Sequence, residues 1–334
     1  MKKFKKGLSI LLVFIILLTL WPAIALGVGE ATLDLPDGSI VITATGYSQG
    51  GGAEIPHTAG YIITGSTTAD TIQVVSGTHD IMLDDAMINI PAATATTTTQ
   101  ANTVCAFSIS GNADVTVTLV NNNALTSAAG YAGLYVELGS SLIVDGTGSL
   151  TVRGGDGRPS SSGTPSYAGG AGIGGNGYNG SHSFGNITID NGTVTATGGA
   201  TSANANYGAG AGIGSGGMSA GPDVYSTPEG TVIINGGVID ATGGTCGYLW
   251  DTGGGAGIGA GGITGSVFEP AHCDVVVEIH GGVVKATGDF DGAGIGGGAN
   301  CNSGDILIDG GKVEANGAGE GDTSSWGGRH RRRR

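Results

Sequence analysis

Two pairs of acidic residues have the types and spacing from which glycan-cleaving or metal-binding sites are built. Asp84 and Asp85 are adjacent, and Asp289 and Asp291 are separated by one residue. Glycoside hydrolysis needs two carboxyl groups that flank the scissile bond, one of them kept protonated by its surroundings. Carboxylate oxygens are also the ligands that calcium prefers, so Asp289 and Asp291 are candidate calcium ligands. Hydrolysis and calcium binding are the two chemistries that these residues offer.

A row of aromatic residues offers a different chemistry, the binding of sugars. Each stands a few residues before one copy of a recurring glycine-rich phrase; they are Tyr167, Tyr207, Trp250 and Phe290, with Tyr248 near Trp250. Aromatic rings stack on apolar faces as they do on one another, and the carboxylate of Asp251 would accept hydrogen bonds from hydroxyl groups. The row predicts a carbohydrate-binding strip along one edge of the fold. The alternative is that the rings pack against each other and close that edge.

The glycine-rich phrase, Gly-Ala-Gly-Ile-Gly, determines how these residues are arranged. It occurs four times, at residues 170–174, 210–214, 255–259 and 292–296, and a divergent copy ends at Leu134. From Leu134 through the four isoleucines the intervals are 39, 40, 45 and 37 residues. Such a period indicates a stack of repeated units. Three copies also satisfy the Gly-x-Gly-x-x-Gly pattern of dinucleotide sites, but that pattern requires a following helix, and no helical periodicity follows.

A second phrase supplies the strands of each repeat. It has the form Ile-x-x-Gly-x-(Val/Ile)-x-Ala-x-Gly; its copies begin at Ile189, Ile234, Ile279 and Ile308, and an imperfect copy begins at Val144. Because side chains alternate between the two faces of a strand, the aliphatic and alanine positions share one face. Two inward columns are therefore expected when the repeats stack about 4.8 Å apart. They are Val194, Ile239, Val284 and Val313, and Ala196, Ala241, Ala286 and Ala315.

These patterns predict an all-β fold, a right-handed single-stranded parallel β-helix (a solenoid) over residues 61–317. On its outer surface, Asp240, Lys285 and Glu314 form a column of alternating charge, which is favourable between neighbouring strands. A second outer column, at the turn before the glycines, contains Asp145, Asp190, Asn235, His280 and Asp309. Asn and Asp bond to the backbone at such turns, so the column is interpreted as a turn ladder. The alternative is a column of calcium ligands.

The two ends of the chain have other compositions. Residues 1–27 combine a lysine-rich start, an apolar run and small residues near the end, the pattern of a cleaved secretory signal peptide. Residues 28–60 are predicted to form an N-terminal strand and cap region, because an uncovered first rung would template aggregation. Residues 318–334 end in a run of arginines and are expected to be a disordered tail, truncated or non-native.

The charge of the chain argues against nucleic acid as a partner. The net charge is −14, and all 27 acidic residues follow the signal peptide. Between residues 28 and 328 the lysines and arginines are Arg153, Arg158, Lys285 and Lys312. Such a surface repels nucleic acid and favours cations or neutral partners. No later stretch is apolar enough to span a membrane, so no membrane association is expected after signal cleavage.

The four cysteines are Cys105, Cys246, Cys273 and Cys301. Cys301 aligns with His272 of the preceding repeat, which places Cys273 and Cys301 about one rung apart. A disulfide between them is geometrically feasible, and a secreted compartment permits it. Zinc binding is less favoured because no Cys-x-x-Cys pair occurs.

The phrases Gly-Ala-Gly-Ile-Gly-Gly and Ile-x-Gly-Gly-x-Val-x-Ala-Thr-Gly resemble those of β-helical surface proteins of Gram-positive bacteria, often described as carbohydrate-binding. The resemblance covers roughly residues 60–317. It implies a pectin-lyase-like fold, a secreted or cell-surface location, and a polysaccharide or another extracellular matrix component as partner. The chain differs from many such proteins because no sorting signal or wall-binding module stands at its end, which leaves the mode of anchoring open.

The sequence is compatible with three functions. The first is a non-catalytic secreted or cell-surface protein that binds extracellular polysaccharide through its loop-edge aromatics. The second is a structural or adhesive spacer without a glycan ligand. The third is a polysaccharide lyase or hydrolase, which the same fold supports in pectin lyases and polygalacturonases. The Asn-Thr-Asp, Gly-His-Gly and Arg-Ile-Lys motifs of polygalacturonases are absent, and a lyase base would need an arginine or lysine, so catalysis is the least favoured.

Overall fold

The computed structural model describes residues 29–91, 105–158, 167–177, 182–201, 207–219, 227–247, 253–264 and 271–318. Within these residues the chain is almost entirely β, and the helical structure is one 3-10 turn, η1 (Leu35–Asp37). The predicted all-β class is therefore confirmed. The predicted signal peptide, residues 1–27, lies outside the described residues, as does the tail from residue 319 onward. None of the described helical structure is long and apolar enough to span a bilayer.

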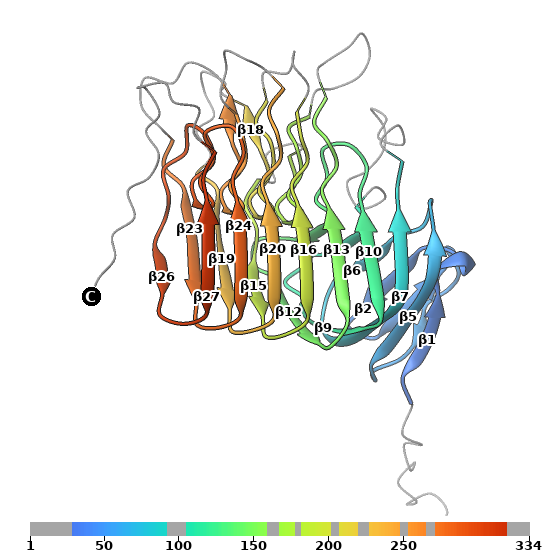
Figure 1. Cartoon of the computed structure of the whole chain (residues 1–334). Coiled ribbons are helices and arrows are strands. Elements are labelled where there is room, and N and C mark those ends of the chain that lie inside the picture. The colour runs from blue at the N-terminus through green and yellow to red at the C-terminus, as the bar shows by residue number, and fades with distance from the viewer. Residues whose placement is uncertain are drawn as a thin grey trace, which may run out of the picture.

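Most strands belong to three parallel ladders, each receiving one strand from each repeat (Figure 1). The first ladder consists of β1 (Ala31–Asp34), β5 (Tyr61–Thr67), β7 (Thr78–Asn89), β9 (Asp114–Val120), β12 (Ser141–Gly146), β15 (Asn186–Ile189), β19 (Glu229–Ile234), β23 (Asp274–Ile279) and β26 (Ile306–Ile308). The second continues from β7 through β10 (Asn122–Thr126), β13 (Ser149–Arg153), β16 (Thr193–Thr197), β20 (Val238–Thr242), β24 (Val283–Thr287) and β27 (Lys312–Asn316).

The third ladder contains the glycine-rich phrase. It consists of β2 (Ile40–Thr43), β6 (Ile72–Val74), β8 (Phe107–Ile109), β11 (Leu134–Val136), β14 (Ile173–Gly174), β17 (Ile213–Gly214), β21 (Ile258–Gly259) and β25 (Ile295–Gly296). Two further strands, β18 (Met218–Ser219) and β22 (Ile263–Thr264), follow β17 and β21 in the sequence and pair with each other in parallel. From β8 onward the chain passes through the third, first and second ladders in that order in every repeat.

The register of the second ladder is the one expected from the repeat phrase. Val194 is paired with Ile239, Ile239 with Val284 and Val284 with Val313. The alanine column and the outward column of Asp240, Lys285 and Glu314 follow the same register. Val194, Ile239 and Val284 are buried, so the column forms part of a core that only stacked repeats can enclose.

The corner between the first and second ladders requires a left-handed backbone. The residue before each of the last four second-ladder strands has a positive φ, at Gly192 (93°), Gly237 (80°), Gly282 (81°) and Gly311 (75°). Glycine adopts this conformation without the steric cost of a Cβ atom. In earlier repeats Asp85 (φ 53°) and Asn121 (φ 53°) take it instead, since Asn and Asp tolerate it best among other residues.

The N-terminal end is closed by antiparallel strands. β3 (Gly46–Gln49) pairs with β2 in an antiparallel sense, and β4 (Ile55–Pro56) pairs with β3. Parallel pairing already starts at Ala31, with β1 on β5 and β2 on β6, inside the region predicted as a cap. The cap and the first strands of the ladders therefore interleave along the sequence.

A disulfide and two buried thiols account for the cysteines. Cys273 and Cys301 are joined, with their Cα atoms 6.2 Å apart, which ties the last repeat to the one before it. Cys105 and Cys246 are buried. Burial raises the pKa of the Cys105 thiol above its ordinary value, which keeps this thiol protonated and unreactive.

Candidate carbohydrate-binding edge

The loops that enter the third ladder meet along one edge, and backbone hydrogen bonds join them from repeat to repeat. The amide of Ala209 donates to the carbonyl of Gly253 (2.8 Å), and the amide of Gly254 donates to the carbonyl of Phe290 (3.2 Å). These bonds connect three successive repeats. Tyr207 stands two residues before Ala209. The bonds therefore place Tyr207 and Phe290 on the same edge, two repeats apart.

Tyr207 and Phe290 are both partly exposed at this edge. Among the Phe and Tyr residues that the structure describes, one other is partly exposed, Tyr47 in β3, and it packs in the N-terminal cap. The remaining described aromatic rings are buried in the core. The edge is thus the place in the described repeats where aromatic rings reach solvent.

Phe290 is held at the edge by a strained turn. Both Phe290 (φ 38°) and Asp291 (φ 66°) have a positive φ, which is costly for residues other than glycine. The turn is closed by the amide of Gly292, which donates to the carbonyl of Asp289 (2.9 Å), and by the amide of Asp291, which donates to the carbonyl of Ala318 (2.8 Å). The turn fixes the backbone of Phe290 and so sets where its partly exposed ring leaves the edge.

Tyr167 occupies a different environment from the one predicted. Its side chain is 1% exposed, its ring centroid lies 6.4 Å from that of Tyr131, and the Arg158 guanidinium lies over its face at 5.0 Å. Arg158 and Tyr167 also pair through both backbone groups. In this conformation the ring is packed against its neighbours and has no face for a sugar, so we leave Tyr167 out of the candidate strip.

Tyr248, Trp250 and Asp251 lie outside the described residues. The described chain resumes at Gly253, whose carbonyl accepts the bond from Ala209. Gly253 therefore lies between the repeats of Tyr207 and Phe290, while the part of Tyr248, Trp250 and Asp251 in the strip stays a prediction from sequence.

The candidate calcium ligands Asp289 and Asp291 are both partly buried. Burial raises the pKa of the Asp289 carboxyl group, partly opposed by a hydrogen bond from the backbone of Phe290. The described residues contain no cluster of three or more His, Cys, Asp or Glu side chains able to hold a metal ion. Two carboxylates supply fewer ligands than the six to eight oxygens that calcium takes, so further oxygens would have to come from elsewhere.

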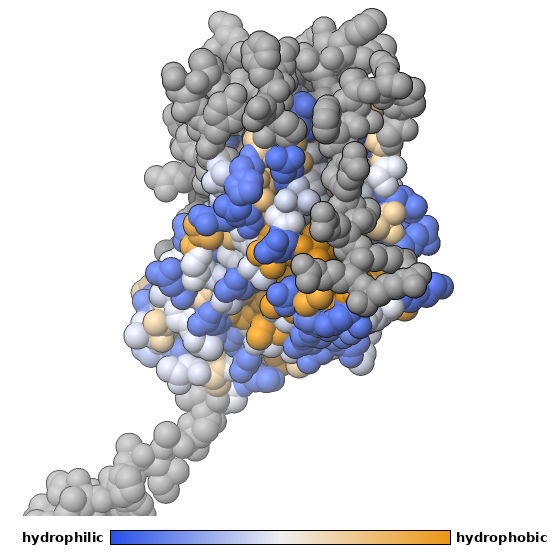
Figure 2. Space-filling view, turned by 90° about the vertical axis from the view of Figure 1, so that its left-hand side faces the viewer, coloured by the Kyte–Doolittle hydropathy of each residue, from blue (hydrophilic) through white to orange (hydrophobic). Residues whose placement is uncertain are grey.

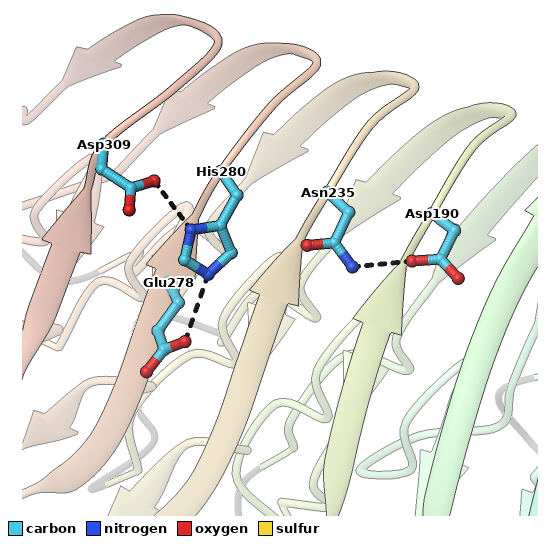
Figure 3. A network of polar contacts seen from close by, with 5 residues as sticks. All are labelled: Asp190, Asn235, Glu278, His280 and Asp309. Carbon is cyan, nitrogen blue, oxygen red and sulfur yellow. Dashed lines mark hydrogen bonds and ion pairs between the residues drawn. The ribbon is translucent and has the colours of Figure 1, made fainter.

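The polar column at the corner forms hydrogen bonds from repeat to repeat (Figure 3). The side-chain amide of Asn235 donates to Asp190 (2.8 Å). His280 Nδ1 lies 2.7 Å from Asp309 and Nε2 lies 3.3 Å from Glu278. These bonds raise the pKa of His280, that with Asp309 contributing most and that with Glu278 next. The side chains are thus used to join repeats, which is the behaviour of a turn ladder.

Asp145 in this column bonds locally, accepting from the amide of Gly146 at 2.7 Å. Glu278 was not singled out from the sequence. It could have been, because it stands two residues before His280, in extended chain at the end of β23, and residues at that spacing share a face.

The acidic pair Asp84 and Asp85 lies at a corner between the first and second ladders. Asp84 accepts a hydrogen bond from the side-chain amide of Asn121 (2.7 Å), and Asp85 accepts one from the amide of Asn122 (3.3 Å). Both carboxylates therefore bond to the same corner of the next repeat. They do not face each other across a space for a substrate, as the two carboxyl groups of a glycosidase must.

No family model, no curated protein and no solved structure matches this chain.

Proposed function

We propose that this chain is a right-handed single-stranded parallel β-helix, secreted or held at the cell surface, that binds extracellular polysaccharide without cleaving it. The three ladders and the constant order in which the chain visits them support the β-helix. The observation that carries the binding function is the pair of partly exposed rings, Tyr207 and Phe290, on the edge where successive loops meet. Tyr248, Trp250 and Asp251 extend this strip by sequence.

The spacing of the strip suits a linear polymer better than a single sugar. Tyr207 and Phe290 belong to repeats that are two apart, which corresponds to roughly 10 Å at the usual strand spacing. A ligand that contacts both rings must therefore extend along the stack. The acidic composition favours a neutral polysaccharide, because a polyanionic glycan would be repelled.

Glycan-array binding of the secreted chain tests the proposal, with Tyr207→Ala/Phe290→Ala as the key variant. Each ring contributes about 0.5–1.5 kcal/mol by stacking, so the double variant should bind at least about fivefold more weakly. Val238→Ala/Val283→Ala is the matched control, since it shortens two exposed side chains of the second ladder and should bind normally. A folded double aromatic variant that binds every glycan as the parent does would refute the strip.

A structural or adhesive spacer is the second candidate function. The buried packing of Tyr167 on Tyr131 and Arg158 shows that an aromatic residue at this position of the repeat can serve the loop edge alone. An array with no glycan bound, with or without calcium, would support the spacer. Binding that disappears when calcium is chelated would instead support a calcium site that includes Asp289 and Asp291.

A further inference from the structure

The C-terminal end of the described stack exposes side chains that are buried in every earlier repeat. Ile308 is 44% exposed, whereas Ile279, its partner in the preceding strand, is 0% exposed. Ala315 is exposed and Val313 partly exposed, while Ala286 and Val284 are buried. Figure 2 looks onto this end and shows apolar side chains gathered at its centre, surrounded by hydrophilic ones.

The strands at this end also have an unpaired edge. Within the described residues, β26, β27 and β25 are the final strands of the three ladders. Each pairs on one side only, with β23, β24 and β21. An open edge beside apolar side chains is a template for another chain, so this end has the features of a docking surface.

The N-terminal end does not offer a matching surface. There β3 and β4 fold back over β2 in antiparallel pairing, and the inward residues Leu33, Leu35 and Ile42 are buried. A head-to-tail stack of copies would need an open edge at both ends. With one open end, the closed arrangement is the pairing of two identical C-terminal ends about a twofold axis.

We propose that two copies of this chain associate through their C-terminal ends, with β27 of one copy antiparallel to β27 of the other and the axis at Val313. This register places Lys312 of each copy opposite Glu314 of its partner. Both are exposed, and Lys312 forms no ion pair with another described residue. Opposite charges directly across two strands stabilise the pair, whereas like charges destabilise it.

Charge selects this register over its neighbour. An axis at Glu314 would place Glu314 opposite itself in the partner, a like-charge contact. On the first ladder, Asp305 and Asp309 flank β26. A twofold axis through β27 exchanges the other two ladders, so β26 does not meet its own copy and these aspartates do not face themselves.

Sedimentation equilibrium of the secreted chain, with its charge-reversal variants, tests the proposal. The parent should be a dimer at micromolar concentrations. Lys312→Glu and Glu314→Lys should each raise the dissociation constant about tenfold or more, because each replaces two attractive pairs by two repulsive ones. The double variant, Lys312→Glu/Glu314→Lys, should restore the dimer. Thr195→Lys is the matched control, since Thr195 occupies the same outward column three repeats away and should leave the constant unchanged.

Three results would overturn the proposal. The first is a parent that remains monomeric at about 100 µM, well above the usual range for a specific interface. In that case slow amide exchange at Ile308 and Val313 would assign the surface to residues 319–334 of the same chain. The second is a dimer indifferent to both single reversals, and the third is a double variant no better than the singles.

Discussion

The two ends of the stack differ in how they bury the inward apolar side chains of their terminal strands. At the N-terminal end the inward side chains of the first strands are buried beneath β3 and an aromatic cluster, in which the rings of Tyr47 and His57 lie 5.9 Å and 5.0 Å from that of Tyr61. At the C-terminal end the inward side chains of Ile308 and Ala315 are exposed and that of Val313 is partly exposed, whereas Ile295 in the third ladder remains buried. A repeat cannot bury its own apolar face, so the comparison shows that a covering element, rather than the repeat itself, buries the inward side chains at an end.

The largest difference in stability is expected between alanine substitutions of two equivalent glycines, one in an inner repeat and one in the last repeat. Gly259 and Gly296 have nearly the same φ, 135° and 133°. A Cβ on Gly259 would overlap the carbonyl oxygen of Gly296, whereas one on Gly296 would meet side-chain carbons at 3.3 Å or more, the nearest being the Cβ of Ser303. Gly259→Ala should therefore destabilise by more than about 4 kcal/mol, and Gly296→Ala by about 1–2 kcal/mol from the backbone conformation alone. Equal urea midpoints for the two variants would contradict an open C-terminal end.

The disulfide should give the next largest effect, confined to the C-terminal end. The bond spans 28 residues, and a loop of this size is worth roughly 3–4 kcal/mol. Cys273→Ser/Cys301→Ser should accelerate amide exchange in β26 and β27 by a factor of at least a hundred and leave β2 and β5 unchanged. The parent under reducing conditions is the control and should behave like the variant. Acceleration spread evenly along the stack would mean that the ends are not independent.

The pH dependence should also be confined to the last repeats. The pKa of His280 is raised by its hydrogen bonds to Asp309 and Glu278, so protonation stabilises the folded state. This contribution is complete below the unfolded pKa, about 6.5, and is lost as the pH rises through the folded value. After correction for intrinsic rates, β27 should exchange more slowly at about pH 5.5 than at about pH 8.5. His280→Asn should abolish the difference, and a difference that survives this substitution would refute the role of His280.

The smallest effect should come from the outward charge column. The Nζ atom of Lys285 lies 3.4 Å from a carboxylate oxygen of Asp240, and both side chains are about half exposed. Such surface pairs contribute at most about 1 kcal/mol, so Asp240→Asn should change the urea midpoint little, and less at high salt than at low salt because salt screens exposed charges. A loss of stability comparable to that of Gly259→Ala would show that the charge column contributes substantially to the free energy of unfolding.

The repeats could be predicted from the sequence because their signals are local and recur. The 45-residue offset between Ile189 and Ile234, together with strand alternation, gave the pairing of Val194 with Ile239 that the structure has. The corner glycines followed from the same phrase. The disulfide partners Cys273 and Cys301 could be proposed from the alignment of repeats alone.

Features that depend on a single neighbour could not be predicted in this way. Tyr167 and Tyr207 both stand 6 residues before their isoleucines, yet Tyr167 is buried and Tyr207 is partly exposed. Tyr131 and Arg158 pack on the ring of Tyr167, and the position of Tyr167 in its repeat does not reveal these contacts. Likewise, the antiparallel strand β3 occurs once, so no repeat period in the sequence predicts it.

Amide exchange measured at both ends over a range of protein concentrations tests most directly whether one end of the stack is closed and the other open. We predict that β2 exchanges as slowly as the inner strand β20 at every concentration. We predict that β27 exchanges rapidly in dilute protein and slows as the concentration rises and the C-terminal ends pair. Rapid exchange in β2, or exchange in β27 that is slow and independent of concentration, would contradict this description of the molecule.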